Sequence, residues 1–324
     1  MEMTERYYAA YLNREEQLKR SSSGGIAYAI SEQIILSGGV VFGIRYSEDF
    51  LYAKYVKIDN LNNLSLLNGS KYITTGKVID GVGVYKSVHD MLLNQKRVLF
   101  IGTPCDIGNL NKFLEKNEYK DFDRLFTLDF ICQGPMNAKI QKEYIRFLEQ
   151  KYNSTLVNFS VRYKHPYWKP VYLRAVFSNG KEHIKPLYST DFGRAFRIYG
   201  LERCYNCKYK DINHCSDITV GDFWGLQPED KGYNKYGTSV LISHTDKGEK
   251  MLSKLSDVLF FEYDKEKAVG NNPMYYESRK KNVKFHKFEE IYLYGGLHKA
   301  VFYTRNFPSK IKYLLKLCLG KRPY

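Results

Sequence analysis

Two short apolar segments, each followed by a turn and a helical pattern, most strongly limit the folds open to this 324-residue chain. The first, Val98–Ile101, precedes the turn Gly102–Cys105 and a helical pattern through Leu110. The second, Leu125–Cys132, precedes a helix expected near 137–151. Strands that alternate with helices in this way are typical of βαβ units with parallel strands. We therefore predict an α/β fold whose mixed sheet is flanked by helices.

The segments around these units favour the same architecture. Ile26, Ile30 and Ile34 recur at helical spacing and predict an amphipathic helix over 24–36. The other elements expected before residue 190 are strands at 39–46 and 52–58 forming an antiparallel hairpin, a helix near 85–95, antiparallel strands at 156–163 and 171–177, and a turn at 178–180. We expect one domain over residues 1–270, with a candidate subdivision near residue 152.

Positive charge is concentrated in a C-terminal extension over residues 271–324. The chain carries a formal charge of +15, and this extension holds 12 Lys and Arg against three Glu, a net of +9. A basic helix is expected to begin at Pro308 and Ser309 and to place Cys318 on its apolar face. Docking on the protein body is the expected role, and peripheral contact with an anionic membrane is the alternative. No nucleic-acid reading module accompanies the charge, so a nucleic-acid partner is not expected.

Cysteine usage depends on the compartment. The chain has neither a run of 18 apolar residues nor an N-terminal signal-peptide profile, so we expect no transmembrane segment and a cytoplasmic location. In a reducing compartment its six cysteines are better candidates for metal ligation or redox chemistry than for disulfides.

The spacing of three cysteines predicts a metal centre. Cys204 and Cys207 form a C-x2-C pair, and Cys215 follows after seven residues. Thiolates at this spacing suit an iron-sulfur cluster or zinc, and His214 offers a Cys3His zinc set. Adjacent residues point in different directions in most backbone geometries, which favours a fourth ligand from another segment.

Two further cysteines are candidates for that ligand. Cys105 and Cys132 each follow one of the two predicted parallel strands. Because a right-handed βαβ crossover places the carboxyl ends of both strands on one edge, their thiols are expected to be near neighbours where open α/β sheets bind ligands. Each could also be a small buried apolar residue.

A serine-glycine segment at residues 21–25 has two interpretations. It caps the helix that follows, or its glycines let a phosphate approach the free N–H groups at the helix N-terminus. No G-x-G-x-x-G or Walker A pattern supports a standard nucleotide loop. Farther along, a predicted strand ends in a glycine-bracketed turn that carries Asp222 and Trp224. This turn is either a buried tight turn or part of a cofactor site.

Several motifs in register resemble the coenzyme F420 hydrogenase/dehydrogenase beta-subunit family over roughly residues 7–270. They are Ser22-Ser23-Gly24-Gly25, Gly69-Ser70-Lys71-Tyr72, Gly102-Thr103-Pro104-Cys105, Cys132, Cys204-x2-Cys207 and Ser216-Asp217-Ile218-Thr219-Val220-Gly221-Asp222. The resemblance implies a 4Fe-4S cluster and a flavin, usually FAD. By this analogy Cys204, Cys207 and Cys215 are ligands, completed by Cys105 or Cys132. The implied flavin pocket comprises Ser22, Ser23, Gly24, Gly25, Lys71, Gly102, Thr103, Pro104 and Asp222.

The resemblance also implies an oxidoreductase that passes electrons between a carrier and a substrate. Many relatives begin with a ferredoxin-like, cysteine-rich segment, whereas this chain has no cysteine before Cys105. We therefore expect a separate ferredoxin or another carrier, such as a reduced flavin or deazaflavin, to deliver electrons, with help from the basic tail. Short relatives often accompany polysaccharide enzymes, which suggests a glycan-related substrate. The alternative is a non-catalytic interaction protein with a structural zinc or cluster site.

Overall fold

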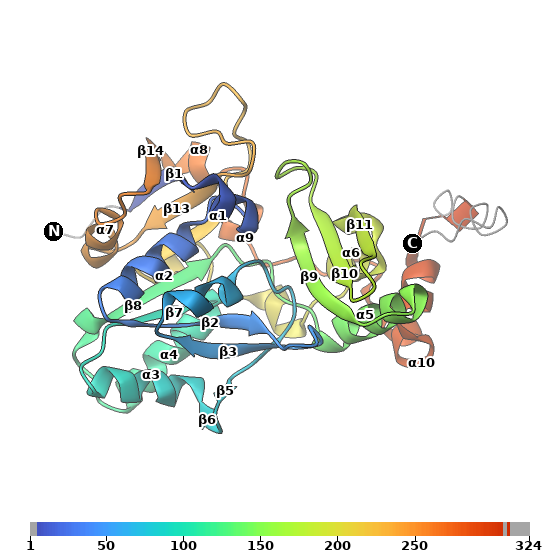
Figure 1. Cartoon of the computed structure of the whole chain (residues 1–324), viewed down its shortest axis with the longest axis horizontal. Helices are drawn as coiled ribbons and strands as arrows, with labels where there is room; N and C mark the ends of the chain where they lie inside the picture. Colours follow the sequence, from blue (N-terminus) through green and yellow to red (C-terminus); the bar gives the residue numbers. More distant parts are fainter. Residues whose placement is uncertain (1–4, 307–309, 312–324) are drawn as a thin grey trace.

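A nine-stranded mixed sheet organises the larger part of the molecule (Figure 1). The structure is a computed structural model that describes residues 5–306 and 310–311. Its strands, in spatial order, are β14 (Val258–Tyr263), β1 (Arg6–Leu12), β13 (Ser239–Ser243), β12 (Ile218–Asp222), β8 (Leu125–Phe130), β7 (Val98–Ile101), β2 (Val40–Tyr46), β3 (Ala53–Ile58) and β4 (Thr75–Gly76). The predicted α/β class and mixed sheet are confirmed.

Four neighbouring parallel strands form the centre of this sheet. β2 pairs with β7, β7 with β8, and β8 with β12, all in parallel. β7 is buried along its whole length, as expected of a strand covered on both faces. The predicted hairpin of β2 and β3 is antiparallel, as expected. The carboxyl ends of the four parallel strands therefore lie along one edge of the sheet.

Helices cover both faces of the sheet. Apolar residues of α2 (Ile26–Leu36) and α7 (Asp246–Leu252) pack with one face in a single buried cluster. α3 (Val84–Leu93) and α4 (Pro104–Lys116) pack with the other face in a second cluster. α4 begins one residue before Cys105, so this cysteine lies in the first turn of a helix and not in the predicted loop. The remaining elements of this unit are α1 (Glu15–Arg20), α8 (Lys265–Val269), α9 (Pro273–Tyr276) and the hairpin of β5 (Val78–Ile79) and β6 (Val82–Gly83).

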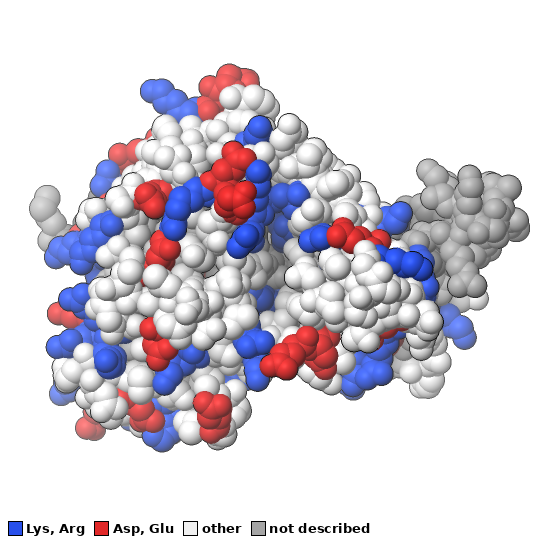
Figure 2. All heavy atoms as spheres, in the orientation of Figure 1, with Lys and Arg blue, Asp and Glu red and all other residues white. Residues whose placement is uncertain are grey.

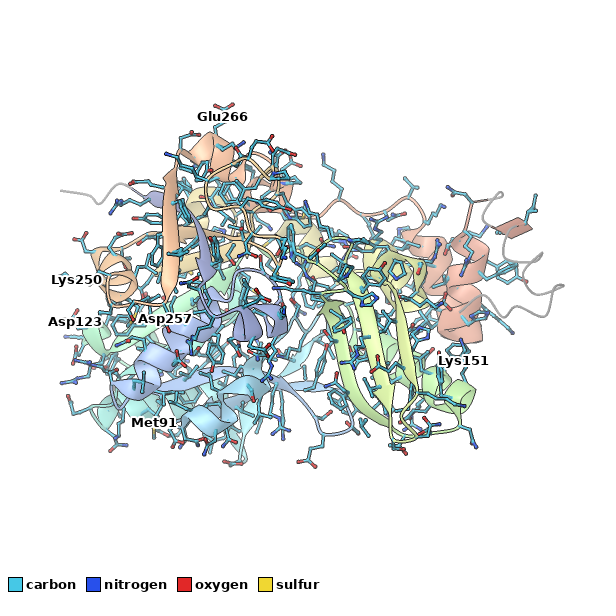
Figure 3. All side chains as sticks on the ribbon, turned by 45° about the horizontal axis from the view of Figure 1, so that its top comes forward. Met91, Asp123, Lys151, Lys250, Asp257 and Glu266 are labelled. Atoms are coloured by element: carbon cyan, nitrogen blue, oxygen red, sulfur yellow. The ribbon has the colours of Figure 1, made fainter. Side chains whose placement is uncertain are left out.

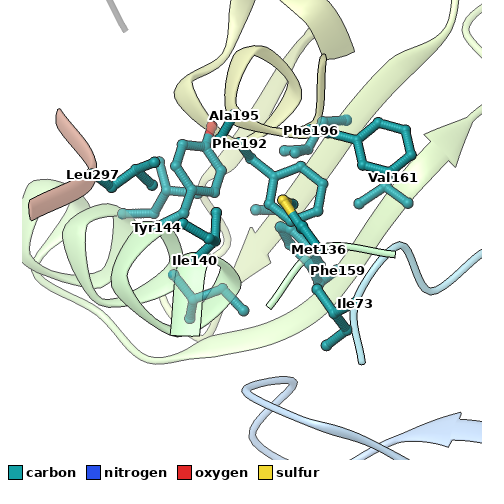
Figure 4. Packing of buried hydrophobic residues seen from close by; sticks show 14 of the residues in the cluster. Ile73, Met136, Ile140, Tyr144, Phe159, Val161, Phe192, Ala195, Phe196 and Leu297 are labelled. Atoms are coloured by element: carbon teal, nitrogen blue, oxygen red, sulfur yellow. The ribbon is translucent and has the colours of Figure 1, made fainter. Parts of the chain in front are cut away.

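A smaller lobe lies beside the large sheet (Figure 1). Its antiparallel strands are β9 (Leu156–Tyr163), β10 (Tyr172–Phe177) and β11 (Glu182–Pro186), and its helices are α5 (Ala138–Tyr152), α6 (Asp191–Ile198) and α10 (Phe285–Thr304). Figure 4 shows its core, in which Tyr144 and Phe192 pack among aliphatic side chains. The predicted strands after residue 152 are confirmed. The predicted helix from Pro308 to Cys318 lies almost wholly outside the described residues. Among the described residues, no helix is long and apolar enough to cross a membrane.

The chain's two tryptophans meet where the lobes touch. Trp168, in the β9–β10 connection, lies 5.0 Å from Trp224 between ring centroids. The Trp168 indole N–H also donates to the carbonyl oxygen of Ser22 at 3.2 Å, and its backbone N–H donates to that of Lys235 at 3.0 Å. The β9–β10 connection therefore holds the small lobe against the large one.

A buried histidine makes the small lobe sensitive to acid. The imidazole of His183 lies between two tyrosine hydroxyls, with Nε2 3.2 Å from Tyr144 and Nδ1 3.0 Å from Tyr152. Burial is the main reason that the pKa of His183 is lowered to about 4, and Lys151 at the outer end of the lobe (Figure 3) and Lys185 act in the same direction. The folded state therefore holds this imidazole neutral.

We expect the free energy of unfolding to fall as the pH drops from 6.5 to 4. In this window the unfolded chain binds the imidazole proton and the folded chain does not, which costs about 2–3 kcal/mol in total. Urea unfolding at several pH values tests this, with His183→Gln as the comparison, because an amide can serve both tyrosines without titrating. Equal losses of stability in the wild type and His183→Gln would assign the acid sensitivity to other groups.

Candidate metal centre

Cys105 and Cys132 follow neighbouring strands at the carboxyl edge of the large sheet, where the strand pattern places them. Thr103 begins α4 through a capping box with Asp106, and its hydroxyl lies 3.1 Å from the Cys105 sulfur. Cys132 follows β8, and its sulfur accepts the backbone N–H of Gly134 at 3.3 Å. Both thiols are thus held by local backbone structure next to the ends of β7 and β8.

Gly134 brings Cys132 against the cysteine-rich loop of residues 202–215. The glycine has a φ of +90°, and a Cβ at this position would lie 2.8 Å from the sulfur of Cys204. Any larger residue would therefore strain the backbone and push Cys204 away. The turn after β8 and the loop that carries Cys204 are consequently packed in direct contact.

Two more contacts fix the loop. The backbone N–H of Cys207 donates to the hydroxyl of Ser278 at 2.8 Å. The ring of Tyr209 lies against Gly108 on α4, where an added Cβ would come within 2.3 Å of the ring. Because Gly108 lies about one turn after Cys105, the loop crosses α4 close to this thiol.

Four of these thiols form one group. Burial is the main reason that the pKa of Cys132 is raised to about 12, and the thiols of Cys105 and Cys204 act in the same direction. Burial likewise raises the pKa of Cys204, with contributions from Cys105 and Cys207. The pKa of Cys105 is raised by burial and also by Cys207. Each of the four thiols thus lies near enough to at least two others to affect their ionisation.

Cys215 lies against the first turn of α4, beside Cys105. Burial, followed by Asp129 and Cys105, raises the pKa of its thiol to about 11. Its side chain packs against the apolar cluster under α3 and α4, and its sulfur lies 3.9 Å from the carbonyl oxygen of Pro104. Its side chain is partly buried, as are those of the other four cysteines.

His214 is occupied elsewhere. Its Nδ1 lies 3.0 Å from a carboxylate oxygen of Asp129 and 3.1 Å from the hydroxyl of Thr219. The predicted alternative of a Cys3His zinc set therefore lacks a free histidine nitrogen on this side of the ring. Within residues 5–306 and 310–311, no three His, Cys, Asp or Glu side chains are placed so that they could hold a metal ion.

Two buried cations lie beside the four thiols. The ammonium group of Lys210 donates to the carbonyl oxygens of Cys132 at 2.6 Å and Met274 at 2.5 Å, and it opposes the rise in the pKa of Cys132. Arg279 donates to the carbonyl oxygen of Phe196, while its Nη1 has no partner among the described residues. In the described part of the chain, no carboxylate forms an ion pair with either cation. The two cations can therefore stabilise a negatively charged group bound by these thiols.

The serine-glycine segment lies at the same sheet edge, but its residues have structural roles of their own. Ser23 donates to the carbonyl oxygen of Thr238 at 3.0 Å. A Cβ on Gly24 would lie 2.2 Å from the carbonyl oxygen of Ala10, and Gly25 has a φ of +82° where α2 begins. Close strand contact and left-handed backbone therefore account for both glycines. A phosphate-binding role for the segment stays a prediction.

Arg162 joins several predicted pocket residues across the two lobes. Its guanidinium forms two hydrogen bonds of 2.8 Å with the carboxylate of Asp222 and donates to the carbonyl oxygen of Ser22 at 3.1 Å. Ser70 donates to the Ser22 hydroxyl at 2.9 Å, so the segment that contains Ser70 and Lys71 contacts the serine-glycine segment. The surface is hollowed between the lobes, with Lys and Arg around the hollow (Figure 2). Ser22 and Asp222 are thus brought together. The ammonium group of Lys71 instead donates to the carbonyl oxygens of residues 67–69 in its own loop, and Gly102–Pro104 lie at the end of β7.

The chain matches a known protein family and resembles a solved structure. The family model for the C terminus of the coenzyme F420 hydrogenase/dehydrogenase beta subunit matches residues 95–268, which include the four grouped cysteines and Cys215. The chain belongs to this family. Its fold is similar to that of a chain in the F420-reducing NiFe hydrogenase complex from Methanosarcina barkeri, with a TM-score of 0.59, 16% identity, and coverage of 90% of this chain and 93% of that chain. None of the curated proteins matches the sequence.

Membership of the F420 hydrogenase beta-subunit family places the chain broadly among redox proteins. Sequence reasoning did not find Arg162, Lys210 or Arg279, because each is an ordinary basic residue whose partners lie in distant segments. The one available signal was that motif residues such as Asp222 need a counter-charge when they are buried.

Proposed function

We propose that the chain is an iron-sulfur flavoprotein oxidoreductase whose cluster is held by Cys105, Cys132, Cys204 and Cys207. The observation that carries the proposal is that Gly134 packs the turn carrying Cys132 against Cys204 and that the loop carrying Cys204 and Cys207 crosses α4 close to Cys105, with buried cations beside these thiols. A cluster bound by four thiolates is anionic, and potentials of such clusters depend on nearby charge and hydrogen bonds. Lys210 supplies positive charge beside Cys132, and Arg279 supplies it beside Cys204.

The arrangement favours a cluster over zinc. Zinc needs four ligands at about 2.0–2.3 Å from one atom, whereas in a 4Fe-4S cluster the thiolates bind different irons and lie farther apart. Thiols that influence one another without converging on a single point fit the second case. The raised pKa values imply that metal binding displaces thiol protons, as ligation generally does.

The hollow between the lobes is the proposed flavin site. Ser22, Lys71 and the Arg162–Asp222 pair would line it, and the Gly102–Pro104 turn would face it from the end of β7. A bound flavin exchanges a hydride with a substrate and single electrons with a cluster. The protein's own contribution is positioning, since the pair holds Ser22 and the end of β12 in fixed places.

The electron donor and the substrate are proposed only as classes. A ferredoxin or another reduced carrier, such as a flavin or deazaflavin, is the proposed donor, and the family resemblance supports it. A glycan-related substrate rests on the family resemblance alone, with no contact in the fold to support it.

Analysis of the anaerobically purified protein tests the proposal. We expect about four irons and four sulfides per chain together with one flavin, read from metal analysis and the visible spectrum. Stoichiometric zinc without iron and flavin would overturn the proposal and favour a structural metal site. Iron and sulfide without flavin would support the proposed cluster and overturn the proposed flavin site.

A further inference from the structure

We propose that the surface over the cysteine-rich loop is a docking site for an acidic one-electron carrier protein. This carrier surface comprises the exposed side chains of residues 202–212 and 277–287. The inference rests on the proposed cluster, because an electron entering here must have a centre to reduce. Each encounter would oxidise the carrier by one electron and reduce the cysteine-bound centre by one.

The two segments of the carrier surface are in contact directly over the thiols. Ser278 holds the backbone N–H of Cys207 at 2.8 Å. The ammonium group of Lys281 lies 5.7 Å from the ring centroid of Tyr205 and 2.9 Å from the carboxylate of Glu202. A protein bound on this face would therefore approach Cys204 and Cys207 more closely than one bound to the sheet faces, which α2, α7, α3 and α4 cover.

The charges of this surface favour an acidic partner. Arg203, Lys208 and Lys287 are exposed, and in the described part of the chain none has a carboxylate ion-pair partner. The three acids of these two segments are already neutralised, since Glu202 pairs with Lys281, Glu277 with Lys280 and Asp211 with Lys265. A positive field of this kind steers an acidic protein and speeds its association.

Two exposed aliphatic side chains complete the surface. Val283 is 97% exposed between the lysines that precede α10, and Ile212 is 80% exposed within the cysteine-rich loop. Electron-transfer encounters use small interfaces, and a few apolar contacts inside a charged rim suit such short-lived complexes.

An anionic membrane fits these features less well. A membrane-binding helix needs a broad apolar face along its length. Here the two aliphatic residues belong to separate segments, and Glu202 and Glu277 lie among the cations. The position next to the thiols also has no purpose in membrane binding.

Stopped-flow reduction of the anaerobic holoprotein tests the site, with a reduced acidic two-cluster ferredoxin as the probe. Lys280→Glu/Lys287→Glu reverses two exposed charges of the surface. We expect the second-order rate constant at low ionic strength to fall at least tenfold and its salt dependence to weaken. Lys116→Glu/Lys120→Glu, at the opposite end of α4 from Cys105, is the matched control and should keep the rate within twofold.

Further measurements distinguish failure of the carrier surface from failure of the proposed function. If reduced methyl viologen reduces the centre at an unchanged rate and iron content is normal, the variant is folded and loaded. Equal ferredoxin rates for the two double variants would then overturn the carrier surface while the proposed function stands. The same holds if Lys280→Glu/Lys287→Glu abolishes co-sedimentation with phosphatidylglycerol vesicles but leaves ferredoxin reduction unchanged. A wild-type protein without iron would instead overturn the proposed function.

Discussion

Cys204→Ser is expected to yield a protein with little or no iron, whereas Cys215→Ser keeps its full complement. Cys204 belongs to the group of four thiols, and its sulfur is held against the turn after β8 by Gly134. Losing one of four ligands should lower the iron content from about four atoms per chain to below one. Cys215 packs against an apolar cluster, where serine changes little volume. Iron and sulfide analysis after anaerobic purification measures the difference.

Far-UV circular dichroism of both variants provides the folding control. If iron is lost equally from both, Cys215 belongs to the ligand set, in agreement with the C-x2-C-x7-C spacing and against the proposed four. If neither loses iron, these cysteines do not hold the metal at all.

Asp222→Asn is expected to lower the free energy of unfolding by about 3–5 kcal/mol, the usual cost of breaking a buried ion pair by removing one partner. The Arg162 and Asp222 side chains are only 8% and 15% exposed, and they form two hydrogen bonds of 2.8 Å. The variant leaves a buried guanidinium without its counter-charge at the junction of the two lobes. Urea unfolding at pH 7 measures the loss.

Glu182→Gln is the matched control for this prediction. It removes the charge from the Arg174–Glu182 pair, which joins β10 and β11 of the small lobe and is more exposed. A loss of at most about 1 kcal/mol is expected there. A similar small loss for Asp222→Asn would mean that water reaches Arg162 and that the pair does not hold the lobes together.

The central strands could be predicted because their sequence signals are local. Val98–Ile101 is a short apolar run followed by a turn and a helix, and the fold contains β7 and α4 at these positions. β1 had no such signal. Its residues Tyr7–Ala10 are buried in succession without alternation, and the strand is defined by pairing with β13 and β14, more than 220 positions later. Pairing over such distances leaves no periodic pattern in the sequence.

In the candidate site, too, local patterns could be read from the sequence, whereas contacts between distant segments could not. Spacing predicts that Cys204 and Cys207 act together, which stays a prediction, and the βαβ pattern placed Cys105 and Cys132 on one edge, where the fold has them. Spacing also attached Cys215 to the first pair, because seven residues can form a loop that returns to a metal. In the fold those residues cross α4, and Cys215 packs against the apolar cluster under α3 and α4, an outcome that depends on tertiary structure and not on spacing.

The contact between Trp168 and Trp224 has a practical consequence. As the chain's two tryptophans, they are its dominant fluorophores, and both lie where the small lobe meets the large one. Intrinsic emission therefore comes mainly from this junction. Any ligand that enters the hollow and shifts the β9–β10 connection would alter the colour or intensity of that emission. The unlabelled protein thus carries its own optical reporter, suited to screening small molecules for binding between the lobes.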